Sequence, residues 1–133
     1  MSAPDADMMA LATRLERFIA TTNDAELDGL FAREVTIIEN FAPHIFRDVA
    51  TWRDAMRRHV HALSDLAFAF GPAHNFAVTG ERAYFDIPIT WTGMLHGKPF
   101  EELGGSAFVL QREGGIWRIA GYAWSVVGMR FTA

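Results

Sequence analysis

The spacing of apolar residues changes near residue 64 and divides the chain into a helical half and a strand half. Between about residues 6 and 21, apolar residues recur at steps of three and four, the period of one face of a helix. These are Met8, Leu11, Leu15, Phe18 and Ile19. From residue 64 the period is two, which is typical of strands, and Leu66, Phe68 and Phe70 begin this alternation.

Two more helices are predicted before the strands begin. Asn23 followed three residues later by Glu26 forms a capping-box pattern, and a short helix after it would bury Leu27, Leu30 and Phe31. Asp48 is a candidate N-cap for the third helix. Its apolar stripe is Val49, Trp52, Met56, Val60 and Leu63.

The strands are predicted from period-two patterns and from the turns between them. We expect a short strand over 35–39 and then strands over 66–70, 76–78, 83–95, 100–112 and 116–127. Pro88 lacks a backbone N–H and needs an edge or a bulge, and Gly104-Gly105 suggests a bulge or a bend. The order predicts one α+β domain over residues 1–133, with three helices packed on the concave face of a curved antiparallel or mixed sheet.

Composition narrows the functional classes. Half of the 133 residues are hydrophobic and 13% are aromatic, a surplus that favours a ligand cavity or a subunit interface. The net charge is −4 and the only basic cluster is Arg57-Arg58, so nucleic acid is not an expected partner. No apolar run reaches membrane-spanning length, and the N-terminal residues do not resemble a signal peptide. We therefore expect a soluble cytoplasmic protein without membrane attachment.

Three segments in this order resemble the nuclear-transport-factor-2-like superfamily. They are "LFAREVTIIEN", the helix that opens after "IFRD", and the ending "GGIWRIAGYAWS". The resemblance spans nearly the whole chain and implies a cone-shaped fold, in which a curved sheet wraps around helices and leaves an apolar pocket. Within the superfamily, the chain is most similar to the branch of ketosteroid isomerases and SnoaL-like polyketide cyclases.

The resemblance also implies roles for individual residues. "VTIIEN" is similar to the segment that carries the isomerases' catalytic aspartate and places a carboxylate, Glu39, at that position. "FDIPITWTG" implies pocket-lining roles for Phe85, Ile87 and Ile89, and "YAWS" implies one for Trp124.

Two departures from the isomerase pattern limit the activity that the resemblance implies. The oxyanion-hole tyrosine falls at Phe18, and the second oxyanion donor falls at Ala107, so neither side chain can donate a hydrogen bond. Efficient steroid isomerisation is therefore not expected. Tyr122, Trp124 and His44 are candidate replacements. Alternatively, Tyr122 and Trp124 are core or interface residues, and His44 is a loop residue in solvent.

Glu39 shares one face of its strand with Val35 and Ile37, because side chains alternate between faces. We expect it to point inward at the mouth of a cavity, where burial raises the pKa of a carboxyl toward the range that suits a general base. The alternatives are a glutamate in water or one paired with Arg47. The predicted lining, with a filled core as the alternative, is Phe18, Trp52, Met56, Phe68, Phe85, Ile87, Ile89, Ala107, Phe108 and Trp124.

Two functions remain open from the sequence. The first is a cofactor-independent isomerase, cyclase or dehydratase that acts on an apolar carbonyl compound with Glu39 as its base. The second is a non-catalytic ligand-binding or assembly module. Neither needs a metal, since no His, Asp or Glu spacing indicates a metal site. A homodimer through the outer sheet face is expected, because the last strand carries bulky apolar side chains such as Trp117 and Tyr122 on both faces.

Overall fold

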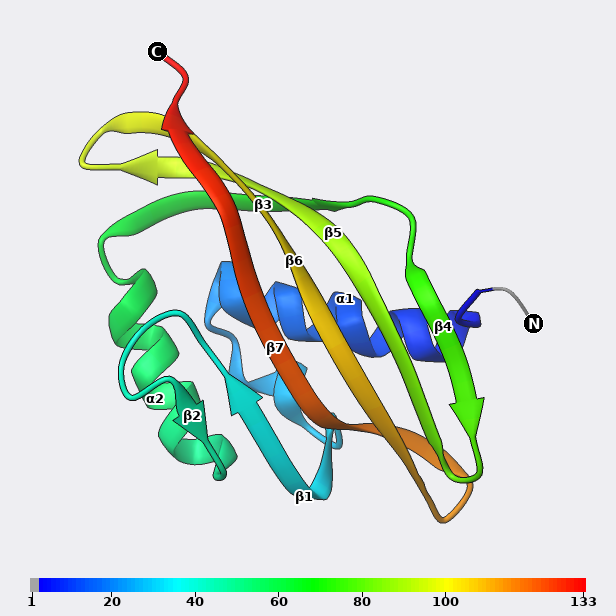
Figure 1. The fold of residues 1–133 in the computed structure, drawn as a ribbon. Coiled ribbons are helices and arrows are strands. Elements are labelled where there is room, and N and C mark those ends of the chain that lie inside the picture. The colour runs from blue at the N-terminus through cyan, green and yellow to red at the C-terminus, as the bar shows by residue number, and fades with distance from the viewer. Residues whose placement is uncertain (1–2) are drawn as a thin grey trace.

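The computed structural model describes residues 3–133 as two α-helices packed on one side of a strongly curved sheet (Figure 1). The helical elements are α1 (Ala6–Thr21), the 3₁₀ turn η1 (Asp24–Leu27) and α2 (Val49–Val60). The strands are β1 (Phe31–Ile38), β2 (Ile45–Phe46), β3 (Leu63–Phe70), β4 (His74–Thr79), β5 (Arg82–Leu95), β6 (Lys98–Glu113) and β7 (Ile116–Phe131).

The seven strands form one mixed sheet. The order is β2-β1-β7-β6-β5-β3, and β4 pairs with β5 separately from that path. β1 runs parallel to β7, and every other pair is antiparallel. Because β5, β6 and β7 are long and curved, one end of the sheet extends past the helices (Figure 1). This confirms the predicted α+β class and the mixed, curved sheet.

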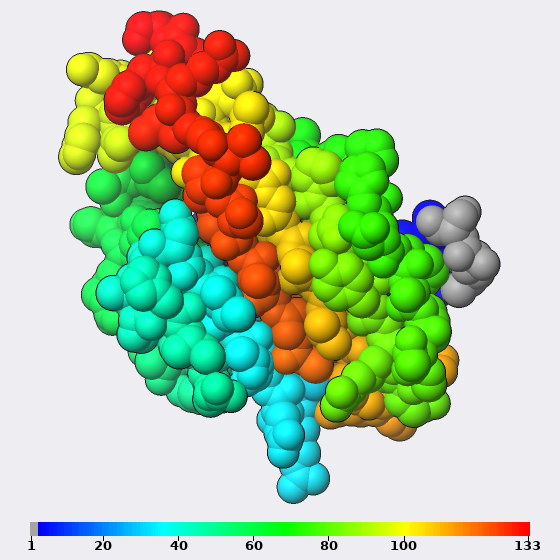
Figure 2. All heavy atoms as spheres, viewed as in Figure 1, coloured from blue at the N-terminus to red at the C-terminus, as the bar shows by residue number. Residues whose placement is uncertain are grey.

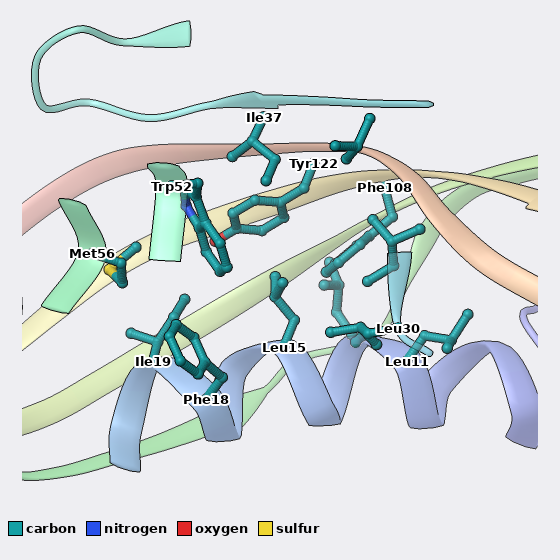
Figure 3. Packing of buried hydrophobic residues seen from close by; sticks show 14 of the residues in the cluster. Leu11, Leu15, Phe18, Ile19, Leu30, Ile37, Trp52, Met56, Phe108 and Tyr122 are labelled. Carbon is teal, nitrogen blue, oxygen red and sulfur yellow. The ribbon is translucent and has the colours of Figure 1, made fainter. Parts of the chain in front are cut away.

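Helix α1 supplies much of the core. It begins where the Asp5 carboxylate accepts a hydrogen bond from the Met8 N–H at 2.9 Å, and it ends at Thr21, followed by the cap residue Thr22, whose φ of 54° is left-handed. The predicted apolar stripe is buried: Met8, Leu11, Leu15, Phe18 and Ile19 are at most 8% exposed. Figure 3 shows side chains of this stripe directed toward the strands. The 3.6-residue period therefore predicted this helix correctly.

The prediction of three helices was wrong, because the segment after Asn23 forms only the 3₁₀ turn η1. The capping role predicted for Asn23 is partly confirmed, since its side chain accepts a hydrogen bond from the Ala25 N–H. Gly29, with a φ of +66°, then redirects the chain, and Phe31 already pairs with β7. The apolar residues assigned to a second helix thus belong to a turn and to the start of β1.

The boundaries of several other elements also differ from the prediction, most clearly those of α2 and β1. Helix α2 begins after its Asp48 cap as expected, but it ends at Val60, and Leu63 starts β3. The strand predicted over 35–39 starts four residues earlier and ends at Ile38. The short β2, which was not predicted, pairs with its end.

Strand β5 forms the centre of the inner face. Phe85, Ile87, Ile89 and Trp91 are each at most 6% exposed, as their alternation predicted. Pro88 lies where β5 changes its partner: the residue after it pairs with β3, and two residues before it the pairing is with β4. The missing N–H of proline therefore falls in the gap between two partner strands.

The opposite face of the sheet is open to solvent in Figure 2, where β7 runs diagonally between β1 on one side and β5 and β6 on the other. Several large apolar side chains are exposed on these strands. They include Ile38, Tyr84, Leu103, Val127 and Phe131. Among residues 3–133, no helix combines the length and the apolar character that crossing a membrane requires.

Candidate active site

Glu39 is buried against an indole. Glu39 is 3% exposed, and the Trp52 ring N–H donates a hydrogen bond to its carboxylate oxygen Oε2 at 2.8 Å. It comes directly after β1 and continues the inner face formed by the buried Val35 and Ile37, as strand alternation predicted. Arg47 makes no ion pair with it. Glu39 thus has a neutral hydrogen-bond donor, and no basic residue of the described chain balances its charge.

The loop after β1 fixes the backbone of Glu39. The Glu39 N–H donates to the His44 carbonyl at 2.9 Å, which closes the turn between β1 and β2. The Nδ1 atom of His44 lies 3.1 Å from the Glu39 carbonyl oxygen, while the imidazole itself is exposed. His44 therefore contacts the main chain of Glu39, and the structure does not bring it to the carboxylate.

Burial raises the pKa of Glu39 to about 7. Desolvation of the charged form is the main cause, and the hydrogen bond from Trp52 partly opposes it. A carboxyl with such a pKa is present in both protonation states near neutral pH. It can therefore accept and return a proton under ordinary conditions.

A second buried carboxyl lies on α1. Glu16 is 0% exposed, and the Ser106 hydroxyl lies 3.4 Å from its Oε1 atom, at the long end of hydrogen-bond distance. The other oxygen, Oε2, is buried without a hydrogen-bond partner in the described structure. Burial first, and then the charge of Glu39, raises the pKa of Glu16 to about 8. At neutral pH this side chain is mostly an uncharged carboxylic acid.

Tyr122 lies near both carboxyls. Its side chain is buried, and its ring meets the Trp52 ring edge-on at 6.5 Å between centroids, as Figure 3 shows. The pKa of the Tyr122 hydroxyl is raised well above its usual range by burial, followed by the negative charges of Glu16 and Glu39. Both carboxyls are therefore close enough to influence one phenol, and the group titrates as a coupled set.

A pocket of about 290 Å³ opens beside this group. It lies between α2, the loop after β1 and the extended ends of β5, β6 and β7. Its walls are mainly apolar and aromatic, with Glu39 and Glu102 as the two carboxyls, and no Lys or Arg of the described residues lines it. The lining is Ile19, Glu39, Asn40, Phe41, Met56, His59, Val60, Ala62, Leu63, Leu66, Trp91, Leu95, Phe100, Glu102, Tyr122, Trp124 and Met129.

The pocket contains only part of the lining that was predicted. Glu39, Met56, Tyr122 and Trp124 belong to it. The other predicted residues lie elsewhere: Phe18, Trp52, Phe85, Ile87, Ile89 and Phe108 fill the solid core. Phe68 is half-buried and packs on Trp91 at 5.3 Å between ring centroids. The pocket therefore lies nearer the extended end of the sheet than the predicted aromatic lining implied.

Ala107 does not face the interior, so its assignment to the inner wall was wrong. Side chains alternate along β6, and it is Ser106, 1% exposed, that points inward beside Glu16. Gly104, where a bulge or a bend was predicted, lies at a register shift between β6 and β7 and does not line the pocket. A Cβ atom on Gly104 would lie 2.5 Å from the Trp124 ring, so this glycine makes space for the indole.

Two important residues were missed in the sequence. Glu16 lies four positions after Ala12 and three before Ile19, so helical spacing already places it on the buried face of α1. Glu102 shares the inner face of β6 with Phe100, two positions before it. The signal in both cases was a carboxylate at an apolar position of a periodic pattern.

Solved structures with the same architecture support the resemblance seen in the sequence. Hexachlorocyclohexane dehydrochlorinase LinA-type3 from Novosphingobium barchaimii LL02 is similar with a TM-score of 0.81 at 10% identity, over 96% of this chain and 89% of that one. The Kfla4162 protein from Kribbella flavida has a TM-score of 0.79 at 14% identity, over 94% and 91%. The fold is therefore nuclear-transport-factor-2-like. No family model and no curated protein matches the sequence.

Proposed function

We propose that this protein is a cofactor-independent acid–base enzyme, an isomerase or a lyase, that takes a proton from carbon in an apolar small molecule. Glu39 is the general base. A ligand in the pocket would meet this carboxylate at a wall that is mainly aromatic and aliphatic, with Glu102 as the other carboxyl of the described lining. Proton removal next to a carbonyl or a leaving group is the chemistry that a lone base can perform there.

The observation that carries the proposal is the environment of Glu39. It lines the pocket, is 3% exposed, has a pKa of about 7, and is oriented by the Trp52 N–H. A glutamate with only a structural role would more simply be paired with a basic residue. The similar structure named above is that of a hexachlorocyclohexane dehydrochlorinase, which makes elimination a reasonable reaction to test here.

Tyr122 is the favoured hydrogen-bond donor to charge that develops on the substrate. It lines the pocket, and the pKa of its hydroxyl is raised well above the usual range. The hydroxyl therefore keeps its proton at neutral pH. Phe18 and Ala107 supply no such donor, because neither side chain carries an O–H or N–H group. The expected rate is therefore below that of an enzyme with two dedicated oxyanion donors.

Solvent exchange tests the proposal without a known substrate. Apolar carbon acids, such as a β,γ-unsaturated cyclic ketone and a polychlorinated cyclohexane, would be incubated with the protein in D₂O and followed by NMR. The wild type should accelerate deuterium incorporation or elimination for at least one class, and Glu39→Gln should lower that rate by about 10² to 10⁴. Glu34→Gln, an exposed glutamate on the same strand, is the matched control. Equal rates for Glu39→Gln and wild type would exclude Glu39 as the base.

The second candidate is a non-catalytic binding module. One observation favours it: the Tyr122 hydroxyl is buried beside Glu16 and Ser106, so the protein itself surrounds the group that would have to contact a ligand. In that case ligands bind to wild type and to Glu39→Gln, and no compound of the panel exchanges protons faster than in buffer.

A further inference from the structure

Glu102 is a carboxylate in the pocket wall that the proposed chemistry does not use. It lies on β6 between Trp91 of β5 and Met129 of β7, its partners in the sheet, and all three side chains line the pocket. It takes part in no ion pair and no side-chain hydrogen bond of the described structure. Burial alone raises its pKa.

Its neighbour in the sequence shows the contrast. Glu101 points to the other face of β6, where Arg130 donates to its carboxylate at 3.0 Å. A basic partner was thus available to this strand, but on the outer face. Inside the pocket the described lining has no Lys or Arg, and His59 is held toward its neutral form because burial lowers its pKa.

The two pocket carboxylates lie toward different ends of the cavity. Glu39 lies beside Trp52 and Tyr122, next to the core. Ile38, next to Glu39, pairs with Ala123 of β7, whereas Glu102 pairs with Met129, and the six positions that separate these two β7 residues span roughly 20 Å of extended strand. Between them the wall consists largely of rings and aliphatic side chains, including Phe41, Trp91, Phe100 and Trp124.

We infer that the natural ligand is an apolar amine, whose ammonium group binds Glu102 and whose apolar body reaches along the aromatic wall toward Glu39. This rests on the proposed function for the role of Glu39 and adds the class of the substrate. An ammonium group supplies the positive charge that the lining lacks, and it also interacts favourably with aromatic faces. A metal ion fits less well, because no group of three or more possible ligands occurs among residues 3–133.

Three probes of matched shape test the inference by calorimetry at pH 7.5. They are 2-phenylethylammonium, the neutral 2-phenylethanol and the anionic 3-phenylpropanoate. The ammonium should bind wild type at least about tenfold more tightly than the alcohol, because a hydrogen bond between charged partners is the stronger one. The anion should bind most weakly. Equal affinity for ammonium and alcohol would overturn the inference.

Variants then assign the effect to one residue. Glu102→Gln should lower ammonium affinity about tenfold and leave alcohol affinity unchanged, whereas Glu101→Gln, on the outer face, should change neither. If Glu102→Gln keeps the full preference for the ammonium, the assignment of Glu102 is wrong. Melting curves of both variants confirm that they are folded.

The proposed function fails separately. Equal solvent-exchange rates for wild type and Glu39→Gln, with the ammonium preference intact, would remove the catalytic role of Glu39 and leave the ligand class standing. If Glu39-dependent exchange persists but the protein shows no preference for the ammonium, the ligand class is wrong and the catalytic role stands.

Discussion

Replacing Glu16 with glutamine should remove a large part of the pH dependence of this protein's stability between pH 5 and 8. Glu16 has a pKa of about 8 in the folded protein, against an ordinary value of 4.5 for a glutamate carboxyl in water. Because its folded pKa is raised, the stability that protonated Glu16 provides is fully present below pH 4.5. It is lost progressively as the pH rises through 8.

The size of the effect follows from the pKa difference. Each pH unit between the two values costs about 1.4 kcal/mol, so at pH 7 the penalty in the free energy of unfolding is on the order of 3 kcal/mol, against less than about 1 kcal/mol at pH 5. Glutamine has the shape of the protonated acid but cannot ionise. Glu16→Gln should therefore resemble wild type at pH 5 and exceed its stability at pH 7 to 8.

Urea unfolding at pH 5, 6, 7 and 8, followed by tryptophan fluorescence, measures this difference. Glu39 has a raised pKa of about 7 and adds a decline of its own, so the double variant Glu16→Gln/Glu39→Gln should be the flattest of the series. Glu34→Gln, at an exposed position, should follow the wild-type curve. Parallel curves for Glu16→Gln and wild type at all four pH values would refute a buried, proton-holding Glu16.

Three further outcomes are expected. Trp52→Phe removes the N–H bonded to Glu39, so the pKa of Glu39 should rise by roughly one to two units and any Glu39-dependent rate should shift to higher pH, as a pH–rate profile would detect. The protein should be a homodimer through the outer sheet face, where Leu103 and Val127 are exposed, and a monomer mass by light scattering at micromolar concentration would contradict this. Turnover of an androstenedione-type substrate should be far slower than in true steroid isomerases, since Phe18 cannot donate a hydrogen bond; rapid turnover would show that another donor replaces it.

The parts of the fold that were predicted correctly are those governed by local periodicity. The stripe of α1 and the alternation along β5 are properties of consecutive residues, and both are buried as expected. The prediction of a second helix was wrong because Leu30 and Phe31 suit a helix or a strand equally well. Pairing of Phe31 with Ile119, almost ninety positions away, decided for the strand.

The candidate site was predicted only in part, because local periodicity determines the direction of a side chain but not its partners on other elements. The inward direction of Glu39 follows from alternation with Ile37, but its hydrogen-bond partner Trp52 is on another element and could not be inferred from spacing. Ala107 was misplaced because a resemblance in sequence leaves the register uncertain by one residue, and one residue reverses the face of a strand. The buried position of Glu16 could have been predicted from helical spacing, because it lies on the same face of α1 as its apolar neighbours.

The most direct test of the central claim is a ¹³C NMR titration of the glutamate side-chain carboxyls. In wild type, two carboxyl signals should titrate near neutrality, with midpoints of about 7 for Glu39 and about 8 for Glu16. Glu39→Gln should remove one of these signals and Glu16→Gln the other. If every glutamate carboxyl titrates below about pH 5.5, close to the ordinary range, neither buried acid holds a proton at neutral pH, and the account of this site as an acid–base centre is wrong.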